Sequence, residues 1–309
     1  MLLCRFPAIL LFCLGVCACL PGDTRPPPGT LLVTATSAAA ADQAPGWLTE
    51  DGWSILYERF LVSLGGANLF GGPNPSGPPC ETYSEGADSR ILDMLVPGPQ
   101  KVSLHFALGQ CLFGFSLVNA WPDSVLGQGV TEDDRSLMSS PGSPREIGVS
   151  LFVQGTASRG DVRKTFAWSF RQPVGFSECT NEPGGGRGQG ITLRQEEAKT
   201  FDLRLHGEAL FYDKVDPAEA TLRFDAFADA DGTFGNDDGS ITVDEFARVE
   251  LAPLQVMDRY REVRPGDRPG PVAPAWRTFG EYVHVGALPN IVRVEGGQCT
   301  LHPGPSQRR

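Results

Sequence analysis

Apolar and polar residues alternate along several stretches of this chain, and the alternation predicts β-strands. In "KTFDLRLHGEALFY" the apolar residues Phe201, Leu203 and Leu205 are separated by charged ones, so we expect one buried face and one face in water. The stretch "DGWSILYERFLVSLGG" alternates in the same way until the pattern slips near Arg59, where a β-bulge is expected.

Other segments share this strand character. They lie at 30–36, 101–109, 111–118 and 278–299, and residues 146–170 have the pattern of a hairpin whose turn is "ASRGD". The 37 glycines and 26 prolines favour short strands and long loops over helices. We therefore expect a mainly β protein, built as an antiparallel β-sandwich.

The hydrophobic period becomes helical near the C-terminal end of the chain. Asp216 is suited to cap a helix that has Pro217 at its first position and runs to Phe227. A second helix is expected after Thr242, because Glu245 three residues later completes a capping box. The sequence thus predicts a helix–loop–helix insertion, similar to an EF-hand, within the β-sandwich.

Between these helices lies the acidic sequence "DADGTFGNDDGSITVDEF", which has features of a calcium-binding loop. Calcium is a hard cation that takes about seven oxygen ligands, so closely spaced carboxylates are the chemical requirement. The predicted ligands are the side chains of Asp229, Asp231, Asp238 and Glu245 and the backbone carbonyl of Ser240.

The spacing of this loop departs from that of a regular EF-hand. Counting back from Glu245 as the twelfth residue places Gly239 at the turn and Ile241 at the apolar eighth position, but Phe234 falls where the first ligand belongs. The early aspartates fit if residues 233–237 are an insertion, which predicts a weak dissociation constant, on the order of 10⁻⁴ to 10⁻³ M. The alternative is a solvated acidic turn that binds no metal.

The N-terminus predicts export. Residues 1–19 have an early arginine, a short apolar run and the ending "VCAC", which resembles the lipobox of bacterial lipoproteins with Cys19 as the lipidated residue. An ordinary cleaved signal peptide is the alternative. Residues 20–46 are rich in Pro, Ala and Thr and are expected to form a flexible tether, although 30–36 within it reads as a strand. The folded domain is expected at 47–309.

Cysteine usage is consistent with an oxidising compartment. Beyond the leader the chain has an even set, Cys80, Cys111, Cys179 and Cys299, which suggests two disulfides. Several pairings are possible, and sequence order favours Cys80–Cys111 and Cys179–Cys299. A zinc site is the rival interpretation, but no C-x-x-C spacing supports it.

The charge balance bears on partners. The formal net charge is -11 and no basic patch is present, so nucleic acid is not an expected partner. The expected location is the bacterial cell envelope, with a lipid anchor in the outer membrane or at the cell surface. An unidentified protein or glycan is the expected ligand.

Four segments together carry a resemblance to a known group. The leader ending "VCAC", "DGWSILYERFLVSLG", "LRLHGEALFYD" and "LRFDAFADADG…DGSITVDEF" resemble a family of uncharacterised bacterial secreted lipoproteins. The resemblance covers most of the mature chain and implies a β-rich region followed by a calcium loop, which in that family is unbroken. A weaker similarity is to periplasmic copper-associated proteins of methanobactin gene clusters, in which an "H…LF" strand corresponds to the segment with His206.

These observations favour a non-enzymatic, membrane-tethered lipoprotein in which calcium stabilises the fold or a binding loop. One alternative is a copper-binding or trafficking protein that uses His206. His105 and His206 both lie on predicted strands and could converge in space. The other is a secreted hydrolase, although the sequence contains neither G-x-S-x-G nor H-E-x-x-H.

Overall fold

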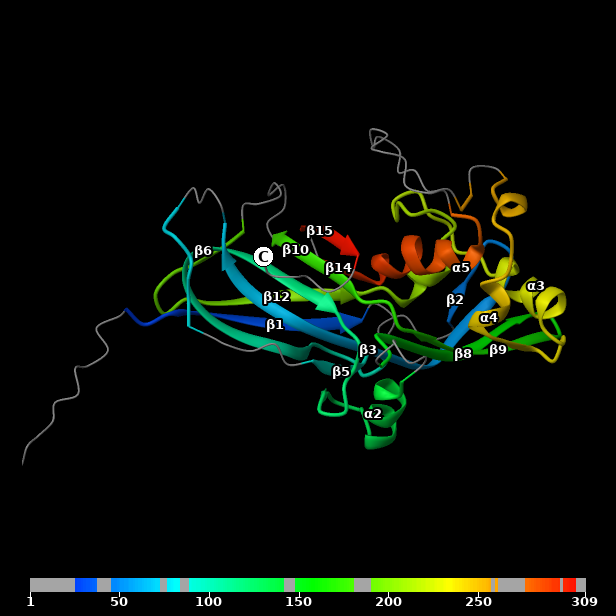
Figure 1. The fold of residues 1–309 in the computed structure, drawn as a ribbon, viewed down its shortest axis with the longest axis horizontal. Helices are drawn as coiled ribbons and strands as arrows, with labels where there is room; N and C mark the ends of the chain where they lie inside the picture. The colour runs from blue at the N-terminus through cyan, green and yellow to red at the C-terminus, as the bar shows by residue number, and fades with distance from the viewer. Residues whose placement is uncertain are drawn as a thin grey trace, which may run out of the picture.

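Two long strands carry the fold, β3 (Ser54–Gly71) and β6 (Gln100–Leu117), each of 18 residues. The computed structural model describes residues 26–37, 46–72, 77–83, 89–141, 148–180, 190–256, 259–260, 276–294 and 297–303. Within these residues the fold is mainly β, and its strands join in one curled sheet (Figure 1).

The main path through the sheet has eight strands. Its order is β13 (Ser240–Ile241), β9 (Val162–Phe170), β8 (Leu151–Arg159), β3, β6, β1 (Gly29–Ser37), β12 (Ala198–Leu205) and β14 (Val292–Val294). The strands off this path are β2 (Trp47–Leu48), β4 (Glu81–Thr82), β5 (Arg90–Asp93), β7 (Val125–Leu126), β10 (Val174–Thr180), β11 (Ile191–Leu193) and β15 (Gln298–Pro303).

Most neighbouring strands are antiparallel, as the sequence predicted; β1–β12, β9–β13 and β5–β7 are parallel. The predicted sandwich of two sheets is not confirmed, since the strands join in one continuous sheet. The physical reason lies in β6, whose first half pairs with β1 while its second half pairs with β3 and β10. Strand β6 lies in the middle of the strand order, and it joins the strands that pair with its first half to those that pair with its second half.

Short helices cover parts of the sheet. They are α2 (Glu132–Ser139), α3 (Asp225–Phe234), α4 (Val243–Phe246) and α5 (Phe279–Glu281), with a π-helical turn at Tyr282–Ala287 and 3-10 turns at Gly207–Phe211, Ala252–Leu254 and Leu288–Ile291. Helices α3 and α4 lie beside the hairpin β8–β9 (Figure 1). In the described part of the chain no helix is both long and apolar enough to span a membrane.

Most local strand predictions agree with the structure. The exception is 278–299, where residues 279–291 are helical because Thr278 and Glu281 form a capping box, and only β14 and the start of β15 are strands. The pairing of β3 with β8 shifts register between Tyr57 and Arg59, which confirms the expected bulge. In β12 the side chains of Phe201, Leu203 and Leu205 are all fully buried, as the alternation required. Residues 146–170 contribute the hairpin β8–β9.

Two longer-range features differ from expectation. The two strands predicted at 101–109 and 111–118 are one strand, β6, because Gly109 adopts a φ of +90° and lets the chain bend without ending the ladder. Strand β1 lies within the range 20–46 assigned to the tether, and it pairs with β6 and β12 in the middle of the sheet. That part of the range is therefore folded.

Both predicted disulfides are present. Cys80–Cys111 joins the segment before β4 to β6, and Cys179–Cys299 joins β10 to β15. Cys19 and residues 1–19 lie outside the described residues.

Aromatic side chains fix the helices onto the sheet. The ring of Trp168 on β9 stacks on Phe227 of α3 at 4.9 Å and meets Phe246 of α4 edge-on at 5.2 Å. Phe227 also contacts Phe279 of α5 at 4.7 Å. Because these rings are all buried, α3, α4 and β9 behave as one packed unit.

The bend in β6 yields a prediction. A Cβ at Gly109 would lie 2.1 Å from the carbonyl oxygen of Pro79, whereas Gly98 has nearly the same φ, +89°, with no atom within 4 Å. Gly98→Ala is therefore expected to cost about 1 kcal/mol of unfolding free energy from backbone strain alone, and Gly109→Ala about 1 to 3 kcal/mol more. Urea denaturation of both variants measures the difference, and equal costs would contradict the steric clash.

Candidate functional site

Helix α3 begins later than the sequence predicted, because a distant residue caps it. Of the helix expected at 216–227, only 225–227 is helical; residues 216–224 form turns and irregular structure, and Asp216 accepts a hydrogen bond within one of the turns. At the true start, Asp51 Oδ2 accepts hydrogen bonds from the backbone N–H groups of Phe224 (2.8 Å) and Asp225 (2.9 Å). A carboxylate at this position satisfies free N–H groups and favours the positive end of the helix.

The exit from the loop agrees with the prediction. Thr242 caps α4: its Oγ1 accepts from the N–H of Glu245 (3.3 Å), and Glu245 Oε2 accepts from the N–H of Thr242 (2.7 Å). Ile241 is buried and pairs with Phe166 of β9, while its carbonyl accepts a hydrogen bond from Trp168 Nε1 (2.8 Å). The loop is thus held against the sheet at this end.

The entrance to the loop does not agree with the predicted insertion. Helix α3 continues to Phe234, so Asp229 and Asp231 lie inside the helix. The helical period persists through the acidic residues because Phe227 and Ala230 are buried on its inner face. The chain leaves the helix at Phe234, where the regular twelve-residue spacing to Glu245 begins.

An ion pair between β9 and α3 occupies the middle of the segment. Lys164 Nζ lies 2.6 Å from Asp231 Oδ2 and 3.4 Å from Asp237 Oδ1. The side chain of Asp231 is fully buried, its Oδ2 also accepts from the N–H of Gly239 (3.0 Å), and its Oδ1 has no hydrogen-bond partner. The hydrogen bond to Asp231 raises the pKa of Lys164. The ammonium group is therefore the cation that neutralises this carboxylate.

Sequence reasoning missed Lys164, although a signal was present. Alternate residues of a strand lie on the same face of the sheet. Lys164 therefore lies on the same face as the buried Phe166 and Trp168. A lysine on an inward face predicts a buried anion nearby. Which anion it meets is decided only by the fold.

The remaining predicted ligands are only partly brought together. Asp238 Oδ1 accepts a hydrogen bond from the N–H of Ser240 (2.8 Å), which lowers the pKa of Asp238. The second oxygen of Glu245 faces Gly235, where a Cβ would come within 2.2 Å of it. Across the described residues, no group of three or more His, Cys, Asp or Glu side chains is arranged to hold a metal ion.

A hollow of about 430 Å³ lies beside the segment. Asp229 and Gly232 line it from α3, and Arg159, Val162 and Lys164 line it from the end of the hairpin β8–β9. Burial, followed by the charge of the nearby Asp225, raises the pKa of Asp229. Asp229 is thus separated from the other predicted ligands and faces a different space.

The two histidines considered for copper do not converge. Strand β1 lies between the strands that carry or precede the two histidines. His105 on β6 is opposite Leu31 of β1. Leu205 on β12, the residue before His206, is opposite Ser37 of β1. Six residues of extended strand separate these positions by about 20 Å. His105 bonds to Ser103, and His206 Nδ1 lies 2.7 Å from the carboxylate of Glu208.

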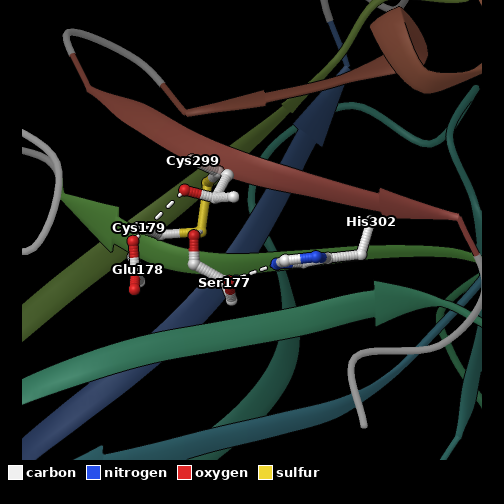
Figure 2. Close-up of a disulfide and its surroundings, with 6 residues drawn as sticks. Ser177, Glu178, Cys179, Cys299 and His302 are labelled. Atoms are coloured by element: carbon white, nitrogen blue, oxygen red, sulfur yellow. Dashed lines mark hydrogen bonds between the residues drawn. A yellow bond between two sulfur atoms is a disulfide. The ribbon is translucent and has the colours of Figure 1, made fainter. Parts of the chain in front are cut away.

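A serine–histidine contact lies beside the second disulfide. Ser177 Oγ is 2.6 Å from His302 Nε2, on the two strands that Cys179–Cys299 joins (Figure 2). A hydrolase of the serine type would also need a carboxylate to orient the imidazole. Within the described residues His302 has no such partner, since the neighbouring Glu178 bonds to Thr300 instead (3.3 Å).

Comparison of the chain with family models, with curated proteins and with solved structures found no match. Function is therefore inferred below from geometry and chemistry.

Proposed function

We propose that this is an exported, membrane-tethered protein whose EF-hand-like segment, 216–253, binds calcium as a structural element of the β-rich scaffold. The observation that carries the proposal is the carboxylate of Asp231. It is fully buried, and its Oδ1 has no hydrogen-bond partner, which is a costly state for a charged oxygen. A divalent cation would satisfy that oxygen.

The residues available for the ion are hard oxygen donors, as calcium prefers. They are Asp231, Asp238, Glu245 and the backbone carbonyl of Ser240, all at or beside the loop between α3 and α4. Asp229 faces the hollow and is not needed in this set. The ion would fix the loop where Ile241 already pairs with β9.

The ion pair of Lys164 sets the calcium affinity that we expect for this loop. Its ammonium group neutralises Asp231 in the absence of metal, so calcium has to compete with it. Competition with an internal cation weakens binding, and the dissociation constant is expected on the order of 10⁻⁴ to 10⁻³ M.

Isothermal titration calorimetry with calcium tests the proposal. Glu245→Gln is expected to abolish the binding heat while keeping the cap of α4, because glutamine also completes a capping box. Asp244→Asn removes the adjacent exposed carboxylate and is expected to bind like the wild type. Identical titrations for wild type and Glu245→Gln would reject calcium binding at this loop.

Export is supported by the two disulfides, which persist in oxidising compartments. The proposed anchor is a diacylglycerol on Cys19, which places the protein in the bacterial cell envelope with the membrane as a partner. Mass spectrometry of the mature N-terminus tests it, and a free thiol and amine on Cys19 would reject it.

A second candidate function, copper binding, is favoured by one contact. The carboxylate of Glu208 holds His206 through Nδ1, the arrangement that orients a metal-binding imidazole, and Glu208 Oε2 is buried without a partner. Copper binding that disappears in His206→Ala would support this alternative, and unchanged binding would reject it.

A further inference from the structure

The sheet presents apolar side chains on its outer face close to the start of β1. Leu31 is fully buried in the core, so its neighbours Thr30 and Leu32 lie on the opposite, outer face. On β6, Phe106 is opposite Thr30 and Leu104 is opposite Leu32. Residues directly opposite each other share a face of the sheet, so the two apolar side chains of β6 lie on the outer face as well.

Across β1, β6 and β12, two neighbouring rows of this outer face contain no charged side chain. Leu104 is 38% exposed and Phe106 is 37% exposed, although both are apolar. In the same rows β12 contributes Ala198 and Thr200, which are also exposed. We call this set the outer patch, and its members are Thr30, Leu32, Leu104, Phe106, Ala198 and Thr200.

Charged side chains border the outer patch. Lys101 on β6 and Asp202 on β12 are both opposite Thr34, in the next row. The carboxylate of Asp202 accepts hydrogen bonds from the hydroxyl groups of Thr34 (2.8 Å) and Thr36 (2.6 Å). The chain as a whole has a formal net charge of -11. A neutral, apolar area on so acidic a protein fits a partner surface that carries no strong charge of its own.

The chain enters the sheet at this patch, a short distance from the proposed anchor. Strand β1 begins at Gly29, ten residues after Cys19, and the next residue is Thr30 of the patch. Ten residues span at most about 36 Å in any conformation. The outer patch is therefore held close to the surface that carries the lipid on Cys19. A short link gives a high effective concentration, so a weak contact is sufficient for docking.

We infer that the outer patch docks onto the lipid bilayer that carries the anchor, with Leu104 and Phe106 in the interfacial region of zwitterionic lipid. The inference rests on the proposed lipid anchor at Cys19. Apolar side chains gain free energy when they enter the membrane interface. Anionic lipid would repel the acidic protein, so a zwitterionic surface is the better match. Docking would fix the orientation of the domain on the membrane, which a flexible tether alone would not.

Quenching of tryptophan fluorescence by brominated phosphatidylcholine tests the inference, because bromine quenches an indole only at short range. The lipidated chain with Phe106→Trp is reconstituted into vesicles of this lipid and compared with Phe234→Trp. Phe234 is a matched control, since it is 36% exposed and ends α3, which lies toward the other end of the molecule from the start of β1 (Figure 1). Quenching above that of the wild type is expected for Phe106→Trp only. Equal quenching of the two variants would overturn the inference.

A second substitution separates docking from tethering. Leu104→Lys, added to Phe106→Trp, puts a charge into the patch and is expected to lower the docked-to-undocked ratio about tenfold. Leu104 is exposed, so urea denaturation is expected to show an almost unchanged stability. Unchanged quenching would overturn the inference. So would a patch covered by a second copy of the chain, in which case lipid does not quench Phe106→Trp and Leu104→Lys converts a dimer into a monomer.

Failure of the anchor and failure of docking give different results. A free thiol and amine on Cys19 in mass spectrometry reject the lipid anchor alone. That thiol is then coupled to a maleimide phospholipid in the same vesicles, and the quenching of Phe106→Trp and Phe234→Trp is compared again with the same expected difference. A mature chain that begins beyond Cys19 has no link at this position and would overturn the inference.

Discussion

Replacing Cys179 and Cys299 together by serine is expected to lower the free energy of unfolding by about 5 kcal/mol. The two cysteines are 120 residues apart in sequence, so the bridge restricts a long loop of the unfolded chain. Replacing Cys80 and Cys111, which are 31 residues apart, is expected to cost about 4 kcal/mol by the same reasoning.

Urea denaturation followed by tryptophan fluorescence measures both costs. The Cys80/Cys111 pair serves as the matched control, because it also contacts the sheet but closes a shorter loop. A larger loss for the Cys80/Cys111 variant would contradict an explanation based on chain entropy. Loss of folding at 37 °C in the Cys179/Cys299 variant alone would agree with the chain-entropy explanation.

Replacing Lys164 by methionine is expected to cost about 3 to 5 kcal/mol, because it leaves the fully buried carboxylate of Asp231 without its cation. Lys199→Met is the matched control. Lys199 lies 3.6 Å from Glu197 in a pair whose side chains are both about one-third exposed, so its loss is expected to cost less than about 1 kcal/mol.

The cost of Lys164→Met depends on pH in a defined way. The pKa of Lys164 is raised above its ordinary value of 10.5, so the stabilisation is fully present below that value and is lost as the pH rises through the folded-state pKa. Measurement at neutral pH therefore captures the whole effect. Equal costs for Lys164→Met and Lys199→Met would contradict a desolvated ion pair.

The same variant links stability to the proposed metal site. Without Lys164 the competing cation is gone, so calcium is expected to bind more tightly and to restore part of the lost stability. Combining Lys164→Met with Asp231→Leu replaces both charges by apolar side chains and is expected to recover part of the loss without calcium. A double variant as unstable as Lys164→Met alone would show that the buried charge is not the cause.

The sequence by itself determined the local features of the fold. The alternation in β12 and the slip near Arg59 in β3 depend on neighbouring side chains, and both were recovered. The cap of α4 was recovered for the same reason, since Thr242 and Glu245 are three residues apart. The pairing of the four cysteines in sequence order also agrees with the structure.

What only the tertiary structure decided were contacts between distant residues. The start of α3 depends on Asp51, 173 residues before Phe224, and a capping signal at Asp216 could not compete with it. Asp231 lies in helix α3 beside the loop and is paired with Lys164, 67 residues away. Short-range patterns specify strands and caps, because their energies arise between near neighbours. The partner of a buried charge is set by which elements pack together, and that is a property of the whole fold.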